Sequence, residues 1–208
     1  MDVGVQGSLL SGVDESVPCA PAGARRTALA DGAWVDVLPG WLTGADALFD
    51  RLAARVPWHA ERRRMYDRVV DVPRLVAYYG ESDLLPDRRL AAALSALNDQ
   101  YAAPLGEPLA TAGLCLYRDG RDSVAWHGDT IGRGAVADTV VAIVSLGAPR
   151  SLLLRPRRGG RSERFPLGSG DLLVMGGSCQ RTWEHAVPKT TRPVGPRISV
   201  QFRPRGVR

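Results

Sequence analysis

The chain has 208 residues, of which 45% are hydrophobic and 24% charged, with 23 Gly and 15 Pro. This suits one domain with a sizeable core and argues against a disordered or fibrous protein. The formal net charge of +5 favours a polyanionic partner, although Lys189 is the only lysine among 27 basic residues, so a general codon bias also explains the arginines.

The three cysteines are odd in number and lack metal-ligand spacing, which argues against a disulfide framework or a zinc site. The N-terminus lacks the basic start and apolar run of a secretion signal, and no apolar stretch reaches transmembrane length. We therefore expect a cytoplasmic protein that does not engage a membrane.

The first predicted elements are a tail and two helices. Residues 1–30 carry few large apolar side chains, which predicts a poorly ordered tail, with order beginning near Trp34. Apolar residues recur at helical spacing over Ala45–Arg55, after Thr43 as a candidate cap, and again over Asp87–Tyr101. Each helix is amphipathic and needs a sheet to cover.

From residue 111 onward, short apolar runs lie between Gly, Pro and Asp turns, which predicts strands. Helices followed by strands indicate an α+β fold, with the helices on one side of an antiparallel sandwich or barrel, in a single domain over residues 31–208. No glycine-rich phosphate loop precedes a helix, so nucleotide-hydrolysing and Rossmann interpretations lack support. The predicted strands are Leu114–Tyr117, Thr139–Leu146, Ser151–Leu154, Asp171–Met175 and Arg197–Arg203.

The segment Trp126-His127-Gly128-Asp129 carries the strongest chemical signal. Side chains two apart on an extended segment point to the same face, so His127 and Asp129 present two ligands in one direction. The distant His185 can add a second imidazole, and two histidines with one carboxylate form the facial set that holds non-haem Fe(II). Each residue alone is more often an ordinary polar residue; their order along the chain favours a metal site.

The last predicted strand alternates between polar and apolar residues, and its polar face carries Arg197, Ser199, Gln201 and Arg203. An ordinary solvent-exposed face is the simplest interpretation. If this face points into a barrel, the two guanidinium groups need anionic partners. A dicarboxylate supplies both anions, and arginine suits it because its planar fork grips a carboxylate through two hydrogen bonds.

With these residues the chain resembles an AlkB-type Fe(II)- and 2-oxoglutarate-dependent dioxygenase of the nucleic-acid oxidative demethylase branch. The resemblance runs from about Trp58 to Arg203 and implies a double-stranded β-helix, or jelly roll, buttressed by N-terminal helices. It rests on Tyr117-x-x-Gly120, His127-x-Asp129, Gly170-Asp171-Leu172, His185, and Arg197 followed six residues later by Arg203.

The resemblance also implies roles for individual residues. Fe(II) would be bound by His127, Asp129 and His185. The distal carboxylate of 2-oxoglutarate would pair with Arg197, while Arg203 would lie near the carboxylate that chelates iron. Implied 2-oxoglutarate contacts are Tyr117, Cys115, Arg197, Ser199, Gln201 and Arg203, with Tyr117 donating a hydrogen bond.

A nucleotide-recognition lid is implied at about residues 58–80, where arginines contact phosphates and aromatic rings flank a flipped base. A basic surface loop is the ordinary alternative. Implied nucleic-acid contacts are Trp58, Arg64, Met65, Tyr66, Arg68, Arg74, Tyr79, Trp126 and Ile131.

Three residues depart from the family's pattern. Cys115 and Ser199 stand where the family usually has Asn, and we expect both changes to weaken 2-oxoglutarate binding, although Ser199 can still hydrogen-bond. Ile131 stands where family members often place an acidic residue, two positions after the metal aspartate. We expect a different base preference from that change.

The implied function is oxidative demethylation of N-alkylated bases, such as 1-methyladenine and 3-methylcytosine, in DNA or RNA, with Fe(II), 2-oxoglutarate and O2. Single-stranded DNA is the favoured partner because the methyl group is reached only on a flipped or unpaired base. We expect a monomer. Two alternatives stay open: the same chemistry on tRNA, protein or a small metabolite, and a non-catalytic jelly-roll binding module.

Overall fold

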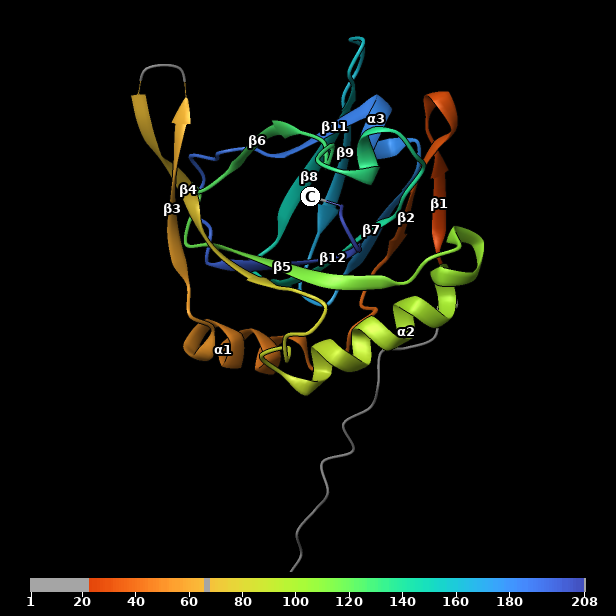
Figure 1. Ribbon diagram of the computed structural model, residues 1–208. Coiled ribbons are helices and arrows are strands. Elements are labelled where there is room, and N and C mark those ends of the chain that lie inside the picture. Colours follow the sequence, from red (N-terminus) through yellow and green to blue (C-terminus); the bar gives the residue numbers. More distant parts are fainter. Residues whose placement is uncertain (1–22, 66–67, 208) are drawn as a thin grey trace, which may run out of the picture.

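The computed structural model describes residues 23–65 and 68–207, without the side chains of residues 62–71 and 102–105. Its strands form two antiparallel sheets that face each other (Figure 1). In spatial order, the larger sheet contains β1 (Arg25–Ala28), β2 (Ala33–Leu38), β10 (Leu172–Gly177), β7 (Val141–Gly147), β12 (Arg197–Pro204), β5 (Leu109–Tyr117), β4 (Arg68–Tyr79) and β3 (His59–Met65). The smaller sheet contains β6 (Val124–His127), β11 (Trp183–Val187), β8 (Arg150–Pro156) and β9 (Glu163–Leu167).

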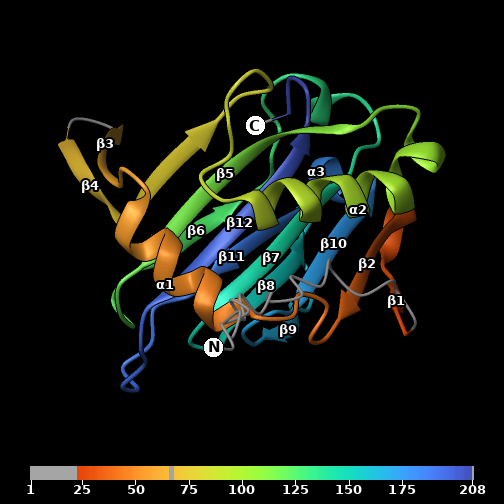
Figure 2. The same cartoon turned by 90° about the horizontal axis from the view of Figure 1, so that it is seen from below.

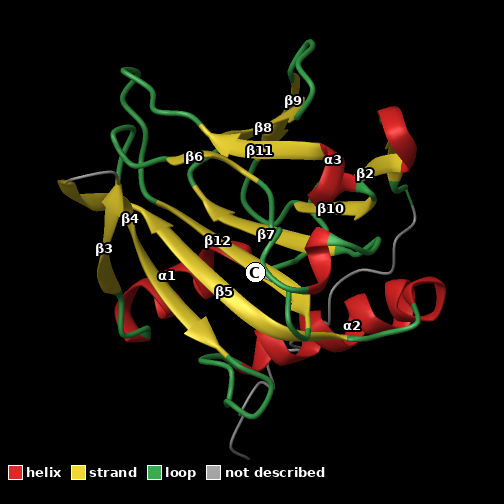
Figure 3. Cartoon of the chain, turned by 45° about the horizontal axis from the view of Figure 1, so that its top comes forward, coloured by secondary structure: helices red, strands yellow, loops and turns green. Residues whose placement is uncertain are grey.

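Two helices, α1 (Ala45–Arg55) and α2 (Arg88–Leu105), cover the outer face of the larger sheet (Figure 2). A short helix, α3 (Cys179–Thr182), precedes β11, and single 3-10 turns occur at Ala30–Gly32 and Arg133–Ala135. Figure 3 shows that the two sheets enclose one interior, with the helices outside it. None of the described helices combines the length and the apolar character that crossing a bilayer requires.

The helices are held by leucines spaced to share one face. Leu48 and Leu52 of α1, and Leu90 and Leu97 of α2, are almost completely buried against the larger sheet. Burying one leucine side chain contributes roughly 1.5–3 kcal/mol, so this contact anchors both helices. The predicted Thr43 cap is wrong. Gly44, with φ of 62°, is the N-cap of α1, and no side chain caps the helix.

The larger sheet separates an outer core from the interior by strand alternation. On β12, Ile198 and Val200 pack toward the helices, while the residues between them face the other sheet. On β7, Val144 packs toward the helices and Ile143 packs into the interior core with Leu154 of β8. The interior therefore receives polar side chains from β12 beside apolar ones from β7 and β8.

The predicted strands and helices correspond to observed ones. The first helix has the predicted bounds, and the second is longer than predicted, ending at Leu105. Four predicted strands fall on β5, β7, β8 and β10, and the last falls on β12, which pairs with both β5 and β7. The α+β class and the sheet-plus-buttress architecture are confirmed.

Two expectations about the first half of the chain need correction. Strands β1 to β4 lie there, so helices do not simply precede strands. Strand β1 falls inside the segment predicted as tail, because residues 25–28 add an edge to the sheet by pairing with β2. Residues 1–22 of that segment lie outside the described residues. Strands β3 and β4 pair as a hairpin over most of the predicted lid.

Candidate functional site

The three predicted metal ligands meet at one point between the sheets. His127 ends β6, and its partner across the β6–β11 pair is His185, with the two ring centroids 4.2 Å apart. Asp129 follows two residues later, and the ligand atoms of all three residues lie within 4.8 Å of one another. Asp129 and His185 are buried, so the chain brings these ligands together inside the fold.

Local contacts fix the orientation of the ligands. The Nδ1 of His127 lies 2.8 Å from the carbonyl oxygen of Ala125. Because a carbonyl only accepts, Nδ1 carries the proton and Nε2 is left with the lone pair that binds a metal. Gly128 is needed here, since a Cβ on it would stand 2.6 Å from the carbonyl oxygen of Gln180.

Gln180 of α3 is a site residue that the sequence analysis missed. Its Oε1 accepts a hydrogen bond of 3.0 Å from the backbone N–H of Asp129, and the side chain is 1% exposed. It holds the backbone of the carboxylate ligand in place. Nothing in the sequence around Gln180 distinguishes it from a surface residue of a short helix, since its role depends on the packing of α3 against β10 and β11.

The protonation states suit a metal. Burial, together with the neighbouring His127, lowers the pKa of His185 to about 3, and burial also lowers the pKa of His127. Burial acts to raise the pKa of Asp129, but the positive Arg203 and the two imidazoles outweigh it, so that pKa is lowered. At neutral pH the group therefore offers two neutral imidazoles and one carboxylate.

A second polar group lies around Tyr117 of β5 and Arg197 of β12. Arg197 is 1% exposed, its Nε donates to Ser145 Oγ at 2.9 Å, and its guanidinium carbon lies 5.4 Å from the centre of the Tyr117 ring. The Nη1 of Arg197 is buried without a described partner. Burial raises the pKa of Tyr117, so the phenol stays protonated and can donate a hydrogen bond.

Tyr117, but not Arg197, lines a pocket that also contains His127 and His185, and Cys115, Ser199 and Gln201 line it too. The Nε2 of Gln201 donates to the backbone oxygen and the hydroxyl of Ser199, and the Sγ of Cys115 lies 3.8 Å from Gln201 Oε1. Gln201 thus contacts both Cys115 and Ser199, the two residues that stand where the family usually has Asn. The residues around the pocket are Arg74, Cys115, Tyr117, Val124, His127, Ile143, Leu152, His185, Val187, Ser199, Gln201 and Arg203.

Arg203 lies at the metal site, in the lining of the same pocket as His127 and His185. Its Nε donates to Asp129 Oδ2 at 2.7 Å, and both side chains are largely buried. Its predicted place near the carboxylate of 2-oxoglutarate that chelates iron stays a prediction. The observed contact makes Arg203 the partner of a metal ligand.

Among the predicted lid residues, Arg74 of β4 reaches the metal pocket. Its Nη1 donates to the backbone oxygen of Ser123 at 3.4 Å, and its Nε is buried without a described partner. Tyr66 and the side chains of Arg64, Met65 and Arg68 lie outside the described residues.

The structure corrects the placement of Trp58 and Tyr79. Both pack against the core between the larger sheet and the helices, and Trp58 Nε1 donates to the backbone oxygen of Ala53 at 3.3 Å. Alternation along β4 explains Tyr79, because Ala77 faces the same core and Arg74 lies on the opposite face. That face carries Tyr78 instead.

Trp126 and Ile131 also lie away from the pocket. Alternation turns Trp126 to the outside of the smaller sheet, where the guanidinium of Arg155 lies 4.3 Å from its ring centre. Ile131 is 70% exposed in the loop after Asp129. Neither residue lines the pocket, although Trp126 is the sequence neighbour of a metal ligand.

The donor set fits the groups that the sequence resemblance implies. Two imidazoles and a carboxylate on one side form the facial set of non-haem Fe(II) sites. The buried, unpartnered Nη1 of Arg197 calls for a hydrogen-bond acceptor, and a carboxylate meets that requirement with its charge.

The profile of the 2OG-Fe(II) oxygenase superfamily matches residues 35–203. The chain belongs to this superfamily. It is therefore an Fe(II)- and 2-oxoglutarate-dependent dioxygenase that uses O2, and its resemblance to AlkB-type members is confirmed by the relatives described next.

This 2OG-Fe(II) oxygenase is 32% identical to alpha-ketoglutarate-dependent dioxygenase alkB homolog 3 from Bos taurus over 206 residues, covering 90% of the chain and 68% of the relative. The Homo sapiens alkB homolog 3 is 30% identical over the same shares. The Homo sapiens DNA oxidative demethylase ALKBH2 is 26% identical over 76% of the chain and 68% of its own length.

Solved structures show the same fold. An oxidoreductase of the 2OG-Fe(II) oxygenase family from Burkholderia pseudomallei matches with a TM-score of 0.57 at 16% identity, over 83% of this chain and 86% of that one. OsALKBH1 matches with a TM-score of 0.55 at 14% identity, over 86% and 99%. These similarities support the jelly-roll architecture of the 2OG-Fe(II) oxygenase.

Proposed function

We propose that this dioxygenase removes methyl groups from N-alkylated bases, such as 1-methyladenine and 3-methylcytosine, in DNA. The observation that carries the proposal is the cluster of His127, Asp129 and His185, which shares a pocket with Tyr117, the ring that the unpartnered guanidinium of Arg197 approaches. The relatives named as alkB homolog 3 and as a DNA oxidative demethylase give the class of substrate.

In this proposal Fe(II) is held by His127, Asp129 and His185, and the distal carboxylate of 2-oxoglutarate pairs with Arg197. The bound iron, with 2-oxoglutarate and O2, supplies the oxidation of the N-methyl group to N-hydroxymethyl, while 2-oxoglutarate becomes succinate and CO2. The hydroxymethyl group then leaves the base as formaldehyde.

The chain's own residues bind and orient the reactants. The Tyr117 phenol is a donor for the cosubstrate, since burial keeps it protonated. Cys115, Ser199 and Gln201 form the wall of the same pocket. Arg203 holds the Asp129 carboxylate in one orientation through the hydrogen bond from its Nε.

The substrate side of the proposal is a lid at about residues 58–80, formed by the β3–β4 hairpin on the domain of residues 31–208. Arginines of this hairpin would contact phosphates, and Arg74 would lie nearest the reacting base, because it already lines the metal pocket. We propose single-stranded DNA as the main substrate, with RNA as a second one, and a monomer acting in the cytoplasm.

The test is direct. The protein is incubated with Fe(II), 2-oxoglutarate and a 1-methyladenine oligonucleotide, and the unmethylated base and formaldehyde are measured, with Asp129→Ala as the inactive control. Parallel reactions with single-stranded DNA, duplex DNA and RNA rank the substrates. The same reactions are run with 3-methylcytosine. If the protein consumes 2-oxoglutarate but demethylates neither base in single-stranded DNA, duplex DNA or RNA, the proposal is overturned, and a protein or small-metabolite substrate is favoured.

A further inference from the structure

Arg150 is a second buried arginine close to the cosubstrate pocket. It begins β8 and is 7% exposed, and among the described arginines only Arg150 and Arg197 are buried. Both guanidinium groups approach the same phenol: their central carbons lie 5.7 Å and 5.4 Å from the centre of the Tyr117 ring. The ring thus lies next to two buried cations.

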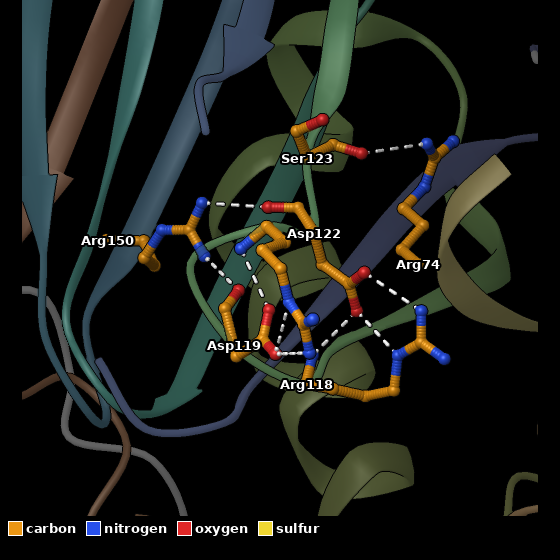
Figure 4. Close-up of polar contacts among 7 residues, drawn as sticks. Arg74, Arg118, Asp119, Asp122, Ser123 and Arg150 are labelled. Carbon is orange, nitrogen blue, oxygen red and sulfur yellow. Dashed lines mark hydrogen bonds and ion pairs between the residues drawn. The ribbon is translucent and has the colours of Figure 1, made fainter. Parts of the chain in front are cut away.

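The hydrogen bonds of Arg150 go to neutral acceptors. Its Nη1 donates to the backbone oxygen of Asp119 at 3.0 Å, and its Nη2 donates to the backbone oxygen of Asp122 at 2.9 Å (Figure 4). The same Nη2 also donates to the backbone oxygen of Pro188 at 2.7 Å. These bonds satisfy its N–H groups and tie the β5–β6 loop to the segment after β11. None of these three bonds goes to a carboxylate.

The nearest carboxylates are engaged elsewhere. The carboxylate of Asp122 accepts hydrogen bonds from Nε and Nη2 of Arg118 (Figure 4), which measure 2.8 and 2.9 Å. The carboxylate of Asp119 pairs with Arg121. No described carboxylate forms an ion pair with Arg150 or Arg197. Two buried like charges without a counter-ion are costly, and an anion bound beside Tyr117 would offset both.

We propose that Arg150 is a positioning residue for the cosubstrate, whose buried charge acts across Tyr117 together with Arg197 to select a dicarboxylate over a monocarboxylate 2-oxo acid. This inference rests on the cosubstrate pocket proposed above. Arg197 supplies the direct contact, and Arg150 acts through the field inside the protein, where charges are weakly screened. It also holds the loop that follows Tyr117, through Asp119 and Asp122.

The experiment compares two ligands of equal length. Isothermal titration of the Mn(II)-loaded protein without oxygen measures the Kd of 2-oxoglutarate and of 2-oxopentanoate, which has a methyl group in place of the distal carboxylate. In the parent protein we expect 2-oxoglutarate to bind on the order of 100-fold more tightly than 2-oxopentanoate. Each tenfold difference in affinity corresponds to about 1.4 kcal/mol. A parental preference below tenfold would overturn the proposal whatever the variants do.

Two variants separate charge from hydrogen bonding. Arg150→Gln keeps amide donors for the backbone oxygens and loses the charge, so it should reduce the preference for 2-oxoglutarate at least tenfold and leave 2-oxopentanoate binding within about threefold. Arg150→Lys keeps the charge and should retain most of the preference. Arg192→Gln, an exposed arginine in the loop before β12, has the same change in net charge and should leave both affinities unchanged.

Other results contradict the proposal. If Arg150→Gln and Arg150→Lys weaken both ligands equally, the residue has only a structural role in tying the loops. If Arg150→Gln leaves the preference unchanged, its charge does not act on the pocket. A wrong assignment of the cosubstrate pocket would give a result distinguishable from these. In that case the parent would not bind 2-oxoglutarate, or Arg197→Gln would bind it as tightly as the parent does.

Discussion

Arg203 and Asp129 form a largely buried ion pair, with 2.7 Å between Nε and Oδ2, at the end of β12. The guanidinium lies beside a metal ligand, so it sets the orientation of the carboxylate before any metal binds. In metal sites such outer partners support ligand geometry, and their loss typically costs 10–100-fold in metal affinity or activity.

Arg203→Met should therefore lower turnover and Fe(II) retention by roughly 10–100-fold, with the fold preserved. Metal content after dialysis and the rate of formaldehyde release measure the two effects. Arg205→Met is the matched control, because Arg205 lies two residues further on and pairs with the exposed Glu81. Equal retention of Fe(II) by the parent and Arg203→Met would show that the pair does not support the metal.

Asp129→Ala should abolish turnover, since two neutral imidazoles cannot replace the anionic ligand of the facial set. Metal titration of the purified variant should show loss of tight Fe(II) or Mn(II) binding. Asp138→Ala removes an exposed carboxylate, paired with Arg181, and should behave as the parent. Activity of Asp129→Ala within about tenfold of the parent would remove this residue from the metal shell.

Arg197→Lys should raise the 2-oxoglutarate concentration required for half-maximal rate by tenfold or more, because one ammonium cannot reproduce a bidentate grip. Burial and the hydrogen bond from Nε to Ser145 fix the orientation of the Arg197 guanidinium group. Initial rates against 2-oxoglutarate concentration, with circular dichroism as a check of folding, measure the effect. An unchanged requirement would place the distal carboxylate elsewhere.

Much of the site could be predicted because its chemistry is local in the sequence. The His127-x-Asp129 spacing and the alternation from Arg197 to Arg203 fix which side chains share a face, and the structure has them on the same side. Apolar runs and helical periodicity likewise predict α1 and five of the later strands, β5, β7, β8, β10 and β12.

The remainder depended on tertiary packing. The role of Gln180 requires α3 to dock beside Asp129, and that of Arg150 requires three distant segments to converge. Tyr79 packs on the helix side of the sheet because of the alternation along β4, and Trp58 does so because it precedes β3 and bonds to Ala53 at the end of α1. Strand β1 was missed because it is a short edge strand, defined by its pairing with β2.

Asp122→Asn should destabilise the fold in a pH-dependent way. Burial acts to raise the pKa of this carboxyl, but the Arg118 fork and the Arg118 backbone N–H outweigh it, so the folded pKa is lowered. A lowered folded pKa gives stability that is present above the unfolded value of about 3.9 and is lost as the pH falls through the folded pKa.

At pH 7 the variant should lose about 1–3 kcal/mol of unfolding free energy, typical of hydrogen bonds to a charged group. Urea unfolding at pH 7 and at pH 3 measures it, and the gap between parent and variant should narrow at the lower pH. Asp119→Asn, in the more exposed pair with Arg121, should change stability much less. A gap that does not depend on pH would mean that the Asp122 charge contributes nothing.

The last prediction concerns the arginines of the proposed lid, the β3–β4 hairpin. Close to the tip of the β3–β4 hairpin, Arg64 pairs with Val69 and Arg68 pairs with Met65. Arg74 instead lines the metal pocket. If the first two contact phosphates, Arg64→Ala and Arg68→Ala should each weaken binding to all sequences alike and reduce the log–log salt slope by roughly one unit.

Substrate-free decarboxylation of 2-oxoglutarate should survive in both tip variants, because the proposed role of the tip is to bind nucleic acid and not the cosubstrate. Arg74→Ala should also lower demethylation at saturating DNA, since its side chain reaches the pocket. Fluorescence anisotropy with a labelled single-stranded oligonucleotide at several salt concentrations measures the slopes. If the double variant of Arg64 and Arg68 keeps the parental slope, the hairpin tip is not the phosphate-binding surface, and Arg158 and Arg161 in the turn between β8 and β9 become the residues to test.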